Sequence, residues 1–210
     1  MRPGPDDGVR ARNRREKTKA LGEAALRLFL ERGVEGVTVD AVVEAAAIAK
    51  GSFYRYFPDL EALVRHLLEP LAVAVARAFD ACDAALAAAR SREDLVRAYE
   101  TLAASLAMSI LGAPDVVRLY LQESRGPASG ARRPIAEVAR DIRARAVRLN
   151  ETAHAHELLK PIPAAIPAHA VVGAAEELVF LGLTAPATLG GPELVGASLV
   201  ELVLDGLRRR

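Results

Sequence analysis

Residues 38–57 read TVDAVVEAAAIAKGSFYRYF, and this stretch decides how the rest of the chain is interpreted. Its pattern predicts two short helices joined by a tight turn. Thr38 is a suitable N-cap for the first helix, because its hydroxyl can accept a hydrogen bond from a free amide of the first turn. Apolar residues then recur at helical spacing up to Ala46. The second helix is expected to begin near Lys50, after a turn in which Ile48 fills the gap between the helices.

The second of these helices has two unlike faces. At roughly 100° per residue, Phe53, Tyr56 and Phe57 gather on one side, which suits a core. The opposite side is small, hydroxylated, aromatic and cationic, which does not suit a core. Glycine and serine allow a duplex to approach the backbone, and the longer polar side chains can reach phosphates or base edges. The residues that predict this nucleic-acid recognition helix are Lys50, Gly51, Ser52, Tyr54 and Arg55.

A longer region around this stretch resembles the DNA-binding domain of the TetR family of transcriptional regulators. The resemblance covers residues 15–68, about a quarter of the chain. It depends most on KGSFYRYFP at residues 50–58, followed by EAL at residues 61–63, and also on AALRLF at residues 24–29. Outside this region only the length and the helical character are similar.

The resemblance implies a homodimeric regulator, in most cases a repressor, that binds a near-palindromic operator in double-stranded DNA. Two recognition helices would enter successive major grooves about 34–36 Å apart. A small apolar effector would release the dimer from the operator. In this interpretation Phe53 and Phe57 fix the helix to its scaffold. Phosphates would be held by Thr38, Lys50, Tyr54 and Tyr56, and bases would be faced by Gly51, Ser52 and Arg55.

Three positions depart from the family pattern. The turn usually carries glycine where Ala47 stands. The recognition helix often opens on a serine or threonine cap where Ala49 stands, and a lysine is frequent at the position of Leu60. These differences are expected to affect operator affinity more than the fold.

Composition and length predict an all-α protein with about nine helices. The chain has 210 residues, of which 51% are hydrophobic and only 4% aromatic, and alanine and leucine are strong helix formers. We expect a disordered arm over residues 1–11, a helix-turn-helix domain over residues 12–66 and an effector-binding and dimerisation domain over residues 67–210. The domain boundary should fall within one helix that begins near Leu60.

Charge is unevenly distributed along the chain. The net charge is only +1, but residues 1–20 contain seven Lys or Arg and three acids, which gives +4. Two interpretations of this stretch remain open, namely a solvated tail and an arm that grips the DNA backbone.

The two C-terminal helices are predicted over residues 168–185 and 192–207. Both are apolar over too much of their circumference for the surface of a monomer. They are either central in the core or part of a subunit interface, and the family resemblance favours a homodimer formed through these two helices.

Other function classes find little support in the sequence. Cys82 is the only cysteine, so no disulfide or zinc-finger framework is possible within one chain. No phosphate loop, nucleophile elbow or metal-binding helix motif is present, and His154 and His156 point apart on a helix. We therefore predict no catalytic residues, no metal and no cofactor. The most apolar windows, 71–89 and 170–189, contain charged residues and are not membrane spans, so a cytoplasmic protein is expected.

An effector cavity would lie among the helices that follow the helix-turn-helix domain. Candidate lining residues are polar or soft side chains on mainly apolar helices, since a pocket needs only a few convergent polar groups. Two alternatives stay open: a regulator that is an activator or takes no ligand, and a helical small-molecule-binding protein or enzyme with a vestigial helix-turn-helix. The candidate effector contacts are Tyr99, Met108, Tyr120 and Gln122, with Ser105, Ser109 and His154 as further possibilities.

Overall fold

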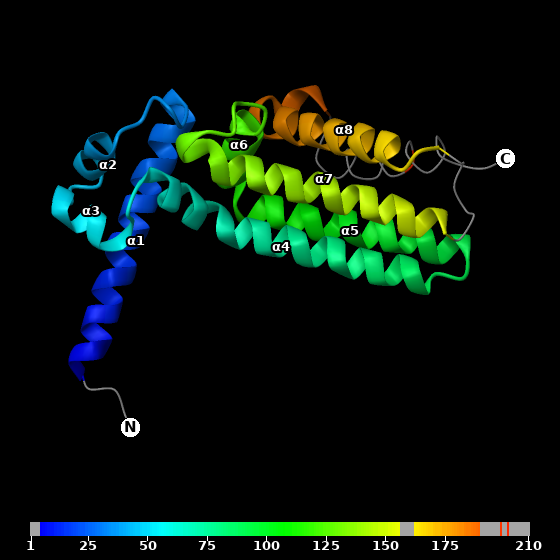
Figure 1. Cartoon of the computed structure of the whole chain (residues 1–210), viewed down its shortest axis with the longest axis horizontal. Coiled ribbons are helices and arrows are strands. Elements are labelled where there is room, and N and C mark those ends of the chain that lie inside the picture. The colour runs from blue at the N-terminus through cyan, green and yellow to red at the C-terminus, as the bar shows by residue number, and fades with distance from the viewer. Residues whose placement is uncertain (1–4, 156–161, 190–197, 199–200, 202–210) are drawn as a thin grey trace. The chain divides into compact units, whose positions relative to one another are not determined.

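The computed structural model describes residues 5–155, 162–189, 198 and 201 (Figure 1). Among these residues every regular element is helical, which confirms the predicted all-α class. The helix predicted over residues 192–207 lies outside the described residues. The eight α-helices are α1 (Pro5–Arg32), α2 (Val39–Ala45), α3 (Lys50–Tyr56), α4 (Leu60–Ala88), α5 (Arg92–Gly112), α6 (Pro114–Glu123), α7 (Arg133–His154) and α8 (Ala165–Thr184), with two 3-10 turns, η1 (Gly130–Arg132) and η2 (Pro186–Thr188).

The chain forms two compact units. Unit 1 contains the residues up to Glu69 together with Gln122–Ala136, and unit 2 contains Pro70–Leu121 together with the residues from Glu137 onward. The division falls within α4, between Glu69 and Pro70. The grouping of Gln122–Ala136 with unit 1 differs from the expected division, in which this segment belonged to the larger domain.

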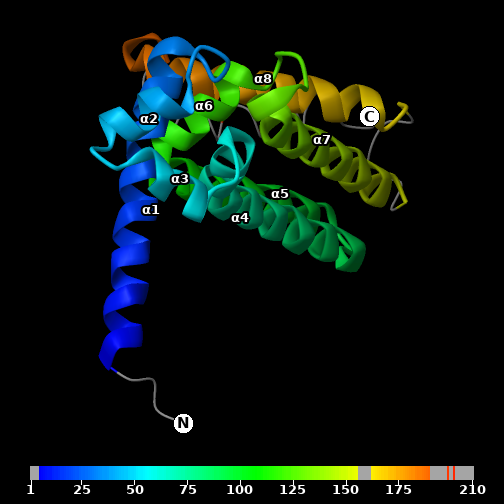
Figure 2. The same ribbon diagram turned by 60° about the vertical axis from the view of Figure 1, so that its left-hand side comes forward.

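Helix α1 is longer than the sequence predicted. It begins at Pro5, whereas the sequence analysis expected an arm over residues 1–11 and a first helix only from residue 12. Proline is favoured in the first turn of a helix, and the aspartates that follow it suit the positive end of the helix dipole. In two views the N-terminal turns of α1 extend away from α2 and α3 (Figures 1 and 2).

The core of unit 1 is built on the C-terminal half of α1. An apolar stripe on this half of the helix faces the core, and Leu21 and Phe29 are completely buried. Gly33 ends the helix with a φ of 72°, and its amide donates to the carbonyl of Phe29 at 2.9 Å. This left-handed conformation favours glycine at a helix C-terminus. The other stripe residues, all buried, are Ala24, Ala25 and Leu28.

A buried carboxylate fastens the Gln122–Ala136 segment to the rest of unit 1. Glu123 is 6% exposed. One of its oxygens accepts the amide of Val34 at 3.3 Å, and the other accepts Nε of Arg132 at 2.7 Å. Arg132 also pairs with Glu35 at 2.9 Å, and Arg133 pairs with Glu61 at 3.0 Å. These contacts join the end of α6 to the loop after α1 and to the start of α4.

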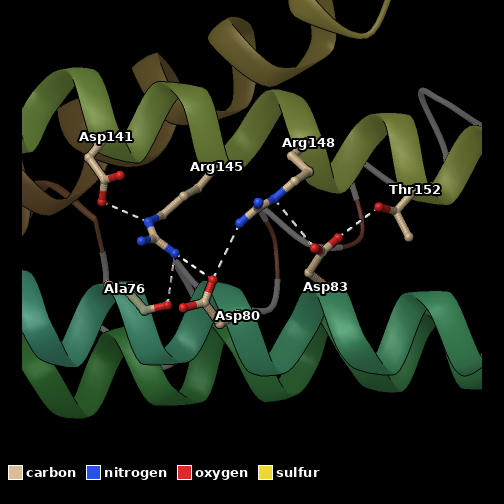
Figure 3. Close-up of polar contacts among 7 residues, drawn as sticks. All are labelled: Ala76, Asp80, Asp83, Asp141, Arg145, Arg148 and Thr152. Atoms are coloured by element: carbon tan, nitrogen blue, oxygen red, sulfur yellow. Dashed lines mark hydrogen bonds and ion pairs between the residues drawn. The ribbon is translucent and has the colours of Figure 1, made fainter.

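In unit 2, α4 and α7 are joined by a row of charged contacts (Figure 3). Arg145 pairs with Asp80 across the two helices and with Asp141 on its own helix at 2.7 Å. Arg148 approaches Asp80 and Asp83 at 3.4 Å each. This row of ion pairs links the two helices along their length.

Beneath this row lies an apolar core that draws on α4 to α8. It includes the lone cysteine, Cys82, whose pKa is raised to about 12 by burial and by the neighbouring charge of Asp83. A thiol with such a high pKa remains protonated near neutral pH, so it is a packing residue and not a nucleophile. The core residues are Leu71, Val75, Phe79, Cys82, Leu86, Leu95, Ala98, Val117, Ala146, Leu149, Ala153, Ala168 and Val172.

Helix α8 is apolar but mostly not buried. By length and composition it could cross a membrane, with a mean hydropathy of 1.4 over a window that is 17% buried. Its middle carries two carboxylates, Glu176 and Glu177. Glu176 accepts the hydroxyl of Tyr120 at 2.6 Å and lies 3.9 Å from the guanidinium of Arg143. These contacts tie α8 to α6 and α7, and a carboxylate at mid-helix is costly in a bilayer.

We predict that Glu123→Ala destabilises the chain strongly. The substitution leaves Nε of the largely buried Arg132 and the amide of Val34 without their acceptor, although Glu35 still pairs with the arginine, and breaking a buried pair costs about 3–5 kcal/mol. Denaturant unfolding measures the change. Glu35→Ala is the matched control, because it removes an exposed partner of the same arginine and should cost about 1 kcal/mol or less. Equal effects of the two substitutions would show that Glu123 does not fasten the segment.

Candidate nucleic-acid interface

The first helix of the predicted motif forms as the sequence indicated. The side chain of Thr38 accepts the amide of Ala41 at 3.2 Å, which confirms it as the N-cap of α2. Val42 and Val43 face the core and are buried. The turn that follows is closed by the amide of Ile48, which donates to the carbonyl of Val43 at 2.9 Å.

Ala47 adopts a conformation that is unusual for alanine. Its φ is 53°, and it is the single non-glycine residue with positive φ among the described residues. A side chain in this left-handed region costs about 1–2 kcal/mol. The alanine at this turn therefore introduces local strain that glycine would not.

Helix α3 begins at Lys50, as predicted, and is positioned by two aromatic anchors. Phe53 is completely buried, and Phe57 is buried at the helix C-terminus. Their ring centroids lie 5.9 Å apart, and Phe57 also contacts the ring of His66 on α4 at 5.4 Å. Asp59 then caps α4, accepting the amide of Ala62 at 2.8 Å. Helix α3 is thus held by its buried side and by the start of α4.

The opposite side of α3 presents the predicted contact residues outward. The side chain of Tyr54 is 53% exposed although its ring edge contacts Phe53, and Arg55 is exposed as well. Ser52 and Tyr56 are half-buried. In the described part of the chain, no hydrogen bond or ion pair engages the Tyr54 hydroxyl or the Arg55 guanidinium. These groups are therefore available to an external partner.

Gly51 is not required by the packing of the protein itself. A Cβ atom at this position would meet nothing within 4 Å. The residue is exposed in the first turn of α3, where a side chain would instead occupy space outside the protein. This arrangement suits close approach of a ligand to the backbone.

Lys50 differs from the prediction in one respect, because it already has a partner. Its ammonium group lies 2.7 Å from Asp40 in α2, and this hydrogen bond and charge raise the pKa of Lys50. Both side chains are more than half exposed. The sequence analysis missed Asp40, because an acid in the first turn of a helix is already explained by the helix dipole. A phosphate that binds Lys50 must compete with this carboxylate.

The four candidate effector contacts do not come together. Tyr120 is buried in unit 2, and Tyr99 packs against the core of the same unit. Met108, in contrast, is 69% exposed on α5, and Gln122 is exposed and belongs to unit 1. Burial raises the pKa of both tyrosines well above the usual range, and for Tyr120 the hydrogen bond to Glu176 adds to this effect. The sequence pattern placed all four on helices but could not assign their faces.

Two curated proteins are similar to the region that carries this interface. The chain is 41% identical over 54 residues to an uncharacterized HTH-type transcriptional regulator, YuxN, of Bacillus subtilis, covering 26% of this chain and 19% of that protein. It is 38% identical over 68 residues to the HTH-type transcriptional repressor KstR2 of Rhodococcus jostii, covering 32% of each protein. The matches thus span less than a third of the length of either relative.

Solved structures share the fold over nearly the whole chain. NalD of Pseudomonas aeruginosa, the secondary repressor of the MexAB-OprM multidrug efflux pump, matches with a TM-score of 0.72 and 20% identity over 94% of this chain and 98% of its own. FadR of Bacillus subtilis in complex with stearoyl-CoA matches with a TM-score of 0.63 and 17% identity over 90% of this chain and 99% of its own. At these identities the likeness concerns the fold.

The fold and the interface together define an all-helical protein with an N-terminal helix-turn-helix domain. The family model of bacterial regulatory proteins of the tetR family matches residues 21–67, which include α2 and α3. The curated proteins similar to this same N-terminal region are an HTH-type transcriptional regulator and an HTH-type transcriptional repressor.

We predict that Ala47→Gly stabilises the chain by about 1 kcal/mol, because glycine adopts positive φ without the steric cost that alanine pays. Denaturant unfolding again measures the change. The matched control is Ala45→Gly, at an exposed position in the last turn of α2, which should destabilise by about 0.5–1 kcal/mol. If both substitutions destabilised the chain alike, the turn at Ala47 would not be strained.

Proposed function

We propose that this chain is a homodimeric transcriptional repressor that binds a near-palindromic operator through α2 and α3 and is released by a small apolar effector. The observation that carries the proposal is the outward side of α3. Tyr54 and Arg55 are exposed there, and the Tyr54 hydroxyl and the Arg55 guanidinium have no polar partner among the described residues, while Phe53 on the other side is completely buried. Residues of this kind on a short exposed helix suit contacts with phosphates and base edges.

In this proposal each contact residue has a role that agrees with its position. Tyr54 and Tyr56 hold phosphates through their hydroxyls, and Arg55 reaches toward base edges. Gly51 and Ser52 lie where the backbone comes closest to the groove. Phosphate contacts at the edges of the motif come from Thr38 and Lys50.

Dimerisation through the C-terminal helices is supported by α8. It is apolar yet largely unburied within one chain, and exposed apolar patches of this extent mark an interaction surface. A second copy that covers α8 would remove this surface from water, with the help of the helix expected over residues 192–207. Two-fold symmetry then requires two half-sites about 34–36 Å apart on the duplex.

Unit 2 is proposed to hold the effector. Its core is apolar, and the buried Tyr120 and the partly buried Tyr99 are the polar side chains best suited to orient a ligand there. An apolar effector agrees with the printed descriptions of FadR, which was solved with stearoyl-CoA, and of NalD, a repressor of an efflux pump. The effector can act only through a difference in affinity between the bound and released states of the dimer. A cytoplasmic location follows from this role.

The test of the proposal is the loss of operator binding in Tyr54→Ala. A gel shift against the DNA that flanks the chain's own gene should show binding by the wild-type chain and at least a tenfold weaker shift for the variant, which is about 1.4 kcal/mol. Circular dichroism and size-exclusion chromatography check that the dimer remains folded. Val73→Ala, which shortens an exposed apolar side chain on α4 in unit 2, is the control and should bind normally. Normal affinity in folded Tyr54→Ala would contradict the assignment.

The pair between Asp40 and Lys50 gives a second prediction about the same interface. Lys50→Ala should lower affinity on all sequences and make the salt dependence shallower by about 0.9 for one lost phosphate contact per protomer. Asp40→Asn should raise affinity, because phosphate no longer competes with a carboxylate for Lys50. The gain should shrink when Asp40→Asn is introduced together with Lys50→Ala, and titrations at several salt concentrations complete this cycle. A loss of affinity in Asp40→Asn would mean that the carboxylate aims Lys50 instead of competing for it.

A further inference from the structure

A cluster of three polar side chains interrupts the apolar core of unit 2. Its members are Tyr120 on α6, Arg143 on α7 and Glu176 on α8, and we refer to them as the three-helix cluster. The hydroxyl of Tyr120 donates to Oε1 of Glu176 at 2.6 Å. The other carboxylate oxygen, Oε2, lies 3.9 Å from the guanidinium of Arg143. Tyr120 is buried, and the side chains of Glu176 and Arg143 are 11% and 33% exposed.

Glu176 occupies a position on α8 that the helical pattern assigns to the core. It follows Val172 by four residues and precedes Val179 by three, and both valines pack in the core of unit 2. The adjacent Glu177, in contrast, is exposed. A carboxylate on the core side of a helix is costly unless it is paired and hydrogen-bonded. Packing alone therefore does not explain why a carboxylate is found at this position.

Arg143 also lies on the core side of its helix. Ala139, four residues earlier, and Ala146, three residues later, are both buried. Arg148 of the same helix is different, because its side chain is more than half exposed and it pairs with aspartates of α4. Arg143 thus directs its charge toward the core, whereas Arg148 belongs to the charged row on the surface.

The ion pair within the three-helix cluster is open. A charged hydrogen bond between a guanidinium and a carboxylate has an N···O distance of about 2.7–2.9 Å, as in the pair of Arg132 with Glu123 at 2.7 Å. At 3.9 Å, Arg143 and Glu176 attract each other without a hydrogen bond. Among the described residues, neither Oε2 of Glu176 nor the guanidinium of Arg143 has another polar contact. Both groups therefore retain hydrogen-bonding capacity.

The separation of these two groups suits a single bridging oxygen. A hydroxyl could accept from Arg143 at about 2.8 Å and donate to Glu176 at about 2.7 Å. If the two bonds met at about 90–110°, they would hold the end atoms about 3.9–4.5 Å apart. The observed distance of 3.9 Å agrees with this range, whereas a closed ion pair would leave no space for a bridging atom.

The charges of the cluster favour a neutral group over a charged one. Arg143 and Glu176 have opposite charges, and Tyr120 remains neutral because burial and its bond to Glu176 raise its pKa well above the usual range. A carboxylate would be attracted by the arginine and repelled by the glutamate, and an ammonium group would meet the reverse. Either charged group would also lose its hydration on entering an apolar core. A hydroxyl is neutral and can both donate and accept.

We propose that the three-helix cluster binds a hydroxyl group of the effector, which accepts a hydrogen bond from Arg143 and donates one to Oε2 of Glu176. Tyr120 is a positioning residue, because its hydroxyl engages Oε1 and leaves Oε2 toward Arg143. The apolar remainder of the effector lies against the core side of α8, which Val179 and Leu183 continue. This inference rests on the proposed function, and it narrows the small apolar effector to a neutral aliphatic alcohol.

The experiment uses three probes that share one apolar chain and differ only in the head group, namely decanol, decanoate and decylammonium. Isothermal titration calorimetry measures the binding of each probe to the full-length chain near neutral pH, without DNA and below the concentration at which the probe forms micelles. The wild-type chain should bind decanol about tenfold or more tightly than either charged probe, which is the effect of one hydrogen bond to a charged group.

Two single substitutions test the head-group selectivity. Glu176→Gln keeps an oxygen that can accept from Tyr120 but leaves Arg143 uncompensated, so it should shift the preference toward decanoate by about tenfold or more. Arg143→Gln leaves Glu176 uncompensated and should shift the preference toward decylammonium by a similar factor. The matched controls are Glu177→Gln and Arg148→Gln, which remove the same charges from exposed positions of the same helices and should keep the wild-type preference. A cluster that only joins the helices would not produce opposite shifts in selectivity.

Three results would overturn the inference. They are the absence of saturable decanol binding to the wild-type chain, tighter binding of either charged probe to it, and selectivity in the two cluster variants equal to that of their controls. Thermal unfolding followed by circular dichroism checks that each variant is folded, and the wild-type titrations decide the matter if a variant is not. Failure of the proposed function looks different, because the wild-type chain would then bind no duplex in the gel shift, while the titrations without DNA would be unchanged.

Discussion

The interface depends on the burial of one side chain, Phe53. Helix α3 is only seven residues long, and isolated helices shorter than about 12 residues are marginal in water. Its position must therefore come from tertiary packing, and burying a phenylalanine contributes about 1.5–3 kcal/mol. Because each residue advances the helix by about 100°, fixing Phe53 inward also fixes Tyr54 and Arg55 outward. One apolar contact thus determines the orientation of the polar groups that would meet a duplex.

Much of the helix-turn-helix could be predicted because its signals are local. The cap at Thr38 and the start of α3 at Lys50 each depend on residues within one or two turns, and the structure confirms both. The capping box at Ser91 is of the same kind, with reciprocal bonds between Ser91 and Asp94 at 3.1 Å. Such short-range patterns can be recognised in a single sequence, because residues that are close along the chain come into contact when the local helix or turn forms.

The sequence analysis missed features whose interacting residues are far apart in the sequence, and features for which the local patterns conflict. Glu123 contacts Val34, 89 residues away, and no periodicity indicates that a loop after α6 belongs to unit 1. The pair between Asp40 and Lys50 crosses a turn whose geometry depends on a strained alanine. At the N-terminus a Pro- and Gly-containing stretch suggested disorder, yet proline and aspartate are also residues that begin a helix.

Although the net charge is only +1, the cationic side chains fall into two groups, those with an ion-pair partner and those without one. In unit 2, Arg145 and Arg148 are satisfied by aspartates of α4 and α7, so they stabilise the packing of one helix on another. In unit 1, Arg14, Lys17 and Arg55 have no ion pair among the described residues, and they lie on exposed helical surface. Salt should therefore act differently on the two units. It weakens an exposed intramolecular pair modestly, but it weakens binding to a polyanion steeply, because every neutralised phosphate releases counterions. The local excess of unpaired cations, and not the total charge, is the property that suits this chain to nucleic acid.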